Sequence, residues 1–137
     1  MTKALKVVMI VYGIVHIFLG LFDIFAHDLV AKMFGFTQVP SYVNWMGEVI
    51  GALFTAIGFW VVVASRDPLR NINWVKLIIT TASLVLVVGV HSVLVGYVQF
   101  SQVGASIVLA GIFVAALLAC YPWRAARIVE KAPSKTP

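Results

Sequence analysis

Hydrophobic residues in this chain are gathered into four long runs, and polar residues fall mainly between them and at the two ends. An α-helix needs about 20 apolar residues to cross roughly 30 Å of hydrocarbon, and each run is close to that length. A lone strand would leave its backbone unpaired in lipid, so helices are expected. The pattern predicts an all-α, membrane-embedded four-helix bundle, with spans at Leu5–Phe25, Val43–Ala64, Trp74–Tyr97 and Val103–Tyr121.

The polar segments set the domain organisation. Residues 1–130 are expected to form a single four-span domain, and Lys131–Pro137 a polar cytoplasmic tail. Between the first two spans we expect a short interfacial helix, capped by Asp28 and closed by Gly35. The turn at Val98–Gln102 is so short that the last two spans must be antiparallel neighbours. The first run is too long for a cleaved signal peptide, and no small-x-small site follows it.

Composition and charge support this prediction. The chain is 62% hydrophobic and 11% charged, against about 25% charged residues in a soluble domain. Its net charge of +5 does not indicate nucleic-acid binding, because the basic residues flank apolar runs. Nine of the ten Lys and Arg residues fall on one predicted side, and only Lys32 lies opposite. The positive-inside rule therefore places both termini in the cytoplasm, in a cell (inner) membrane.

Ionisable residues within the spans are the candidate site, because they are costly in lipid. His16, Asp23 and His27 follow a helical stripe on the first span. Glu48 and His91 lie at similar depth, roughly 8–9 Å below the outer boundary at 1.5 Å per residue. We expect His16, Asp23, Glu48 and His91 to line one outward cavity that binds a cofactor or handles protons. The alternative is a structural hydrogen bond between Glu48 and His91.

Other chemistries are not supported by the sequence. His16 and His27 lie about 16 Å apart on one helix and cannot bind one metal ion. There is no CxxC or HExxH motif and no glycine-rich phosphate loop, so no catalytic residue is predicted. The pair Gly47 and Gly51, and the small residues of the fourth run including Gly111, indicate close helix packing within the bundle or across a dimer.

One stretch resembles a known group of families. Phe34-Gly35-Phe36, then Val39-Pro40, then Gly47-Glu48-Val49-Ile50-Gly51-Ala52 are similar to the outer loop and second span of DoxX-type small membrane proteins. These include the DoxX-like and BphX-like families, which are mostly of unknown function. The resemblance implies a four-helix membrane protein in which Glu48 is the acidic position of the second span.

Three functions follow as hypotheses. The first is a non-catalytic subunit of a larger membrane complex, or a binder of an apolar molecule such as a quinone or lipid. The second is a b-type haem protein with His16 and His91 as axial ligands, although their estimated depths differ by about 7 Å. The third is a dimeric proton-coupled transporter that uses Glu48. The expected partners are membrane lipids and either further copies of the chain or other membrane subunits.

Overall fold

The computed structural model describes residues 2–33, 35 and 40–123, and the predicted tail at Lys131–Pro137 lies outside them. The described chain is all-helical, as predicted. It contains five helices: α1 (Thr2–Phe25), α2 (His27–Met33), α3 (Ser41–Ala64), α4 (Ile72–Leu94) and α5 (Phe100–Cys120).

Four of these helices are long and apolar enough to cross a membrane, at Lys3–Phe25, Val43–Ala64, Ile72–Leu94 and Phe100–Cys120. Their ends agree with the predicted spans to within three residues. Differences of three residues occur at the start of α5 and at the end of α4. There the chain leaves the helix at Leu94 and turns at Gly96, whose φ of +76° is readily adopted only by glycine. Many large apolar side chains point outward, which is consistent with a transmembrane helical bundle.

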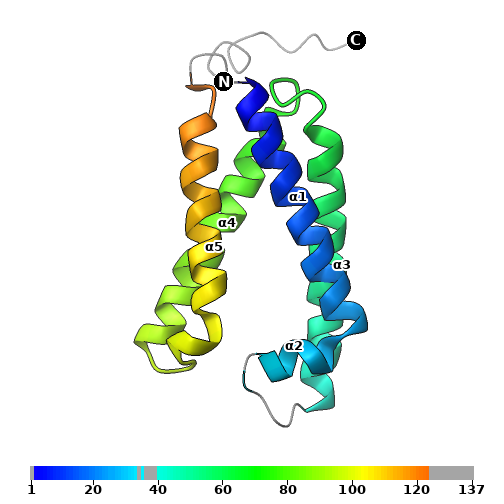
Figure 1. Ribbon diagram of the computed structural model, residues 1–137, viewed down its shortest axis with the longest axis vertical. Helices are drawn as coiled ribbons and strands as arrows, with labels where there is room; N and C mark the ends of the chain where they lie inside the picture. Colours follow the sequence, from blue (N-terminus) through cyan, green and yellow to red (C-terminus); the bar gives the residue numbers. More distant parts are fainter. Residues whose placement is uncertain (1, 34, 36–39, 124–137) are drawn as a thin grey trace.

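The long helices form two antiparallel hairpins, α1 with α3 and α4 with α5 (Figure 1). The predicted pairing of the last two spans is therefore confirmed. The helix α1 begins, and α5 ends, at one end of the bundle, which we call the terminal end. The opposite end carries α2 and the turn between α4 and α5, and we call it the α2 end.

Glycines bring α1 and α3 into close contact. A Cβ atom on Gly58 would lie 2.6 Å from the carbonyl oxygen of Gly13, and one on Gly51 would lie 2.6 Å from that of Gly20. Gly20 lies seven residues after Gly13 on α1, and its partner Gly51 lies seven residues before Gly58 on α3. The two helices therefore run antiparallel in close contact. Gly47 has nothing within 4 Å of its Cβ position, so only one member of the predicted Gly47–Gly51 pair packs against a helix.

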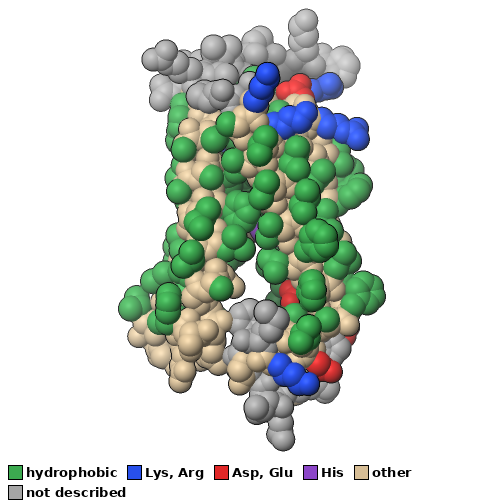
Figure 2. All heavy atoms as spheres, in the orientation of Figure 1, with side chains coloured by type: hydrophobic (Ala, Val, Ile, Leu, Met, Phe, Trp, Pro, Cys, Tyr) green, Lys and Arg blue, Asp and Glu red, His purple; other side chains and the backbone are tan. Residues whose placement is uncertain are grey.

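The two hairpins meet at the terminal end. The buried core there draws on all four long helices, with Leu5, Met9 and Tyr12 from α1 and Leu117 from α5 at 1% exposure or less. From this core the hairpins diverge, and Figure 2 shows an opening between them toward the α2 end. On the face that Figure 2 shows, Lys and Arg side chains lie at the two ends, and hydrophobic side chains cover the length between.

A short helix, α2, is present between the first two spans as predicted, but its start differs from the prediction. The amides of Leu29 and Val30 donate to the carbonyl oxygen of Ala26, so the helix begins at His27, two residues earlier than an Asp28 cap would allow. The correction is that Asp28 lies within the first turn, where a carboxylate favours the positive end of the helix dipole. Gly35 closes the segment as predicted, with φ of +79° and its amide donating to Lys32.

Candidate functional site

A cleft of about 230 Å³ lies where the two hairpins separate. All four long helices contribute to its walls, whereas α2 does not. Its lining residues are Tyr12, His16, Leu19, Phe54, Ala82, Val85, Ser106, Leu109, Ala110 and Phe113. Seven of these ten side chains are purely hydrocarbon, and none is an acid, a lysine or an arginine. The cleft is therefore suited to an uncharged molecule of low polarity.

Aromatic rings form one side of this cleft. The rings of Tyr12 and His16 are stacked, with centroids 3.9 Å apart and an angle of 21° between their planes. Phe113 of α5 meets Tyr12 edge-on at 5.0 Å, and Phe54 of α3 meets His16 in the same way at 5.4 Å. Such edge-to-face contacts hold rings in defined orientations. Helices α1, α3 and α5 therefore fix the position of His16 between them.

The orientation of His16 determines its hydrogen-bonding capacity. Its Nδ1 lies 2.9 Å from the Tyr12 carbonyl oxygen, one helical turn back. A carbonyl oxygen can only accept, so Nδ1 carries the proton in this bond. In the neutral ring Nε2 is then an acceptor, and it has no hydrogen-bond partner among the described residues. His16 thus offers one acceptor atom to the cleft.

Two hydroxyl groups are the other polar groups that line the cleft. Tyr12 is 1% exposed, and its hydroxyl oxygen is buried without a hydrogen-bond partner in the described part of the chain. Ser106 of α5 is exposed and also lines the cleft. The cleft therefore combines a hydrocarbon lining with three neutral polar groups.

The structure separates the four predicted site residues. His16 lines the cleft, but Asp23 lies on the face of α1 that packs on α3, where its Cβ is 2.8 Å from the Cβ position of Gly51. Glu48 and His91 are both exposed, and no hydrogen bond or ion pair joins them. His91 instead contacts the ring of Tyr97, with centroids 6.5 Å apart. Neither Glu48 nor His91 lines this cleft.

The same geometry bears on the haem hypothesis. Axial ligation by two histidines requires both rings to face one central cavity. His16 faces the cleft between the hairpins, whereas His91 is exposed three residues before the end of α4. The arrangement described here does not bring these residues together around one group, so nothing in it favours a haem. Within the described ranges there is also no cluster of three or more His, Cys, Asp or Glu side chains suited to a metal ion.

Several lining residues were not predicted, because only ionisable groups stand out within an apolar span by their cost in lipid. Tyr12 and Leu19 share a helix face with His16, four residues before it and three after it. That spacing could have identified the α1 wall. Phe54, Ser106 and Phe113 carry no comparable signal, since similar residues occur throughout the apolar runs.

Comparisons with known proteins add no family assignment. No family model matches the chain, and neither the curated proteins nor the solved structures gave a significant match. The resemblance to DoxX-type proteins stays a prediction.

Proposed function

We propose that this protein resides in the cell (inner) membrane with both termini in the cytoplasm, and binds a neutral, lipid-soluble molecule in the cleft between its hairpins. A lipid or a quinone has the required polarity. The observation that carries the proposal is the lining of the cleft, which is hydrocarbon apart from Tyr12, His16 and Ser106. A charged ligand would find no opposite charge there, and burying an unpaired charge is costly.

The shape of the bundle supports access from the side. The cleft is lined by both hairpins, which are in contact mainly near the terminal end, so a molecule can reach it by passing between helices. A membrane-soluble molecule would enter directly from the hydrocarbon phase. The function is binding without catalysis, performed as a subunit of a larger membrane complex or as a homo-oligomer.

Filling the cleft tests this proposal. Ser106→Phe places an aromatic ring in the cleft from an exposed position that tolerates a larger side chain. We expect this variant to lose at least 90% of the lipid or quinone that co-purifies with the wild type in mild detergent, measured by mass spectrometry. Ala105→Phe is the matched control, because Ala105 is also exposed on α5 but does not line the cleft. Equal retention of all co-purifying molecules by both variants would refute binding in the cleft.

The proposed orientation is testable at two turns. We expect a reporter inserted after Arg70, between α3 and α4, to be cytoplasmic because basic residues flank that turn. A reporter inserted at Gly96, between α4 and α5, should report the opposite side. A phosphatase and a fluorescent-protein reporter give opposite signals in the two compartments. The same compartment at both sites would exclude α4 as a span, and exchanged compartments would reverse the orientation.

A further inference from the structure

The hydroxyl group of Tyr12 requires a partner that the described chain does not provide. Nearly all buried polar groups in proteins are hydrogen-bonded, yet this oxygen is buried and unpaired in a residue that is 1% exposed. Tyr12 also lines the cleft. An occupant of the cleft is therefore in the right place to supply the missing partner.

His16 adds a second unpaired atom one helical turn away. Its Nδ1 is committed to the Tyr12 carbonyl oxygen, which leaves Nε2 as an acceptor. The two rings are stacked at 3.9 Å, so the Tyr12 hydroxyl and His16 Nε2 belong to adjacent, nearly parallel rings. Two stacked residues that both line the cleft thus carry one hydrogen-bond donor and one acceptor without partners in the described chain.

From this pairing we infer that the occupant is a neutral lipid with a hydroxyl head, which accepts from the Tyr12 hydroxyl and donates to His16 Nε2. This inference rests on the proposed function. A hydroxyl is the simplest neutral group that both accepts and donates. A ketone, ester or ether oxygen would accept from Tyr12 and leave His16 Nε2 unpaired. A carboxylate or phosphate would find no cation among the lining residues.

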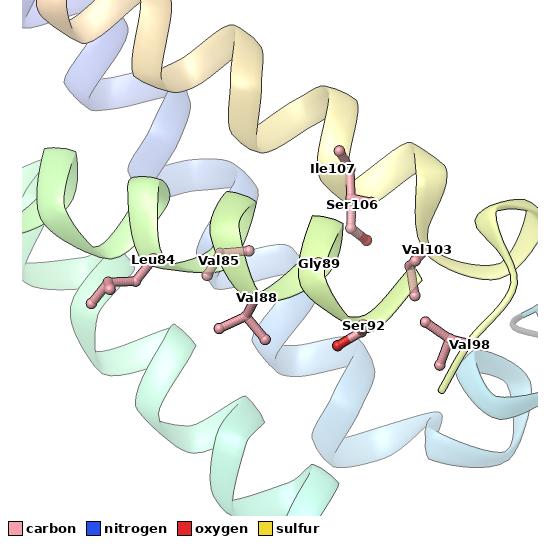
Figure 3. A pocket seen from close by; sticks show the side chains of 9 residues that line it. All are labelled: Leu84, Val85, Val88, Gly89, Ser92, Val98, Val103, Ser106 and Ile107. Carbon is pink, nitrogen blue, oxygen red and sulfur yellow. The ribbon is translucent and has the colours of Figure 1, made fainter. Parts of the chain in front are cut away.

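A neighbouring groove provides room for the tail of this lipid. It has a volume of about 400 Å³ and lies along α4 and α5 (Figure 3). Val85 and Ser106 line both the groove and the cleft, so the two spaces adjoin. Figure 3 shows Leu84 and Val88 of α4 along one side of the groove and Ile107 of α5 along the other. The groove extends to Val98, beyond the end of α4, so the tail leads from His16 toward the α2 end.

The test compares two photoreactive probes that differ in one proton donor. One is a C16 alcohol with a diazirine in its chain, and the other is its methyl ether. With the full-length protein in nanodiscs, we expect the alcohol to label peptides of α4 and α5 about tenfold more than the ether, as one hydrogen bond allows. Tyr12→Phe removes a hydrogen bond that both probes accept, so it should lower labelling by both while leaving the melting temperature of the protein unchanged or higher. His16→Phe keeps a ring but removes the acceptor, so it should reduce alcohol labelling to the level of the ether. Tyr97 is 78% exposed and lies outside the cleft, so Tyr97→Phe should change neither the labelling by the two probes nor the melting temperature.

The outcomes separate the two proposals. Equal labelling by alcohol and ether in the wild type, with both lost in Ser106→Phe, would overturn the hydroxyl inference and leave cleft binding intact. The same conclusion follows if His16→Phe retains the full preference for the alcohol. Labelling that Ser106→Phe does not reduce for either probe would overturn the proposed function itself. His16→Gln provides a second variant, and it should restore part of the preference for the alcohol, because the amide oxygen of glutamine can accept a hydrogen bond.

Discussion

Gly51→Ala is expected to destabilise the protein by about 1–3 kcal/mol, the range for overpacking a close-packed contact. The added methyl group would lie 2.6 Å from the Gly20 carbonyl oxygen and 2.8 Å from the Cβ of Asp23. Most of the obstruction is backbone or a Cβ atom, which cannot rotate away, so α1 and α3 must separate. The free energy of unfolding, measured by SDS titration of detergent-solubilised protein, would report this loss.

Gly47→Ala is the matched control for this prediction. Gly47 lies one turn earlier on the same helix, and nothing lies within 4 Å of its Cβ position. The substitution should leave stability unchanged, or raise it by up to about 1 kcal/mol because alanine favours helix more than glycine does. If both variants lost the same stability, the α1–α3 contact would not lie where the structure places it.

Leu117→Ala is expected to cost about 2–4 kcal/mol, within the range for buried leucine. Leu117 lies on α5, is completely buried, and belongs to the core through which the two hairpins meet. Its truncation should therefore weaken the contact between hairpins rather than the contact within either one. A cysteine pair across α1 and α5 at the terminal end would crosslink more slowly in the variant, in parallel with the lower melting temperature.

The adjacent residue provides the comparison. Leu118 is 40% exposed, and Leu118→Ala removes the same atoms from an outward-facing position. We expect a change within about 0.5 kcal/mol, as for surface substitutions away from packed sites. A loss of stability at Leu118 equal to that at Leu117 would contradict the assignment of the α5 face that meets the other hairpin.

The number of long helices and their boundaries could be predicted because they depend on the length of each apolar run. The Val98–Gln102 turn likewise forced α4 beside α5. The pairing of α1 with α3 could also have been predicted, from the spacing of glycines in the two helices. Gly13 and Gly20 share a spacing of seven with Gly51 and Gly58, which suits two antiparallel helices in close contact. The prediction relied instead on the spacing of four between Gly47 and Gly51, and Gly47 does not pack against a helix.

The candidate site was harder to predict. Counting residues along a span gives the depth of a side chain in the membrane, but not the neighbouring helix toward which it points. Glu48 lies seven residues after the start of α3, and His91 lies three residues before the end of α4. However, α3 and α4 belong to different hairpins, and these have diverged at the α2 end. Two residues at equal depth can then point away from each other. The direction in which each helix faces depends on packing among all four, which no single apolar run encodes.

The divergence of the hairpins has a consequence for how affinity should be measured. A hydrocarbon-lined space of this size that opens to the side cannot remain empty in a bilayer, because acyl chains of neighbouring lipids would fill it. The proposed ligand then has to displace a bilayer lipid from the cleft. The measured free energy of binding is therefore the difference between the binding free energies of the ligand and of that lipid. Saturation should follow the mole fraction of ligand in the membrane rather than its concentration in the aqueous phase. Diluting the nanodisc bilayer with inert phospholipid at constant ligand and protein would therefore release the ligand.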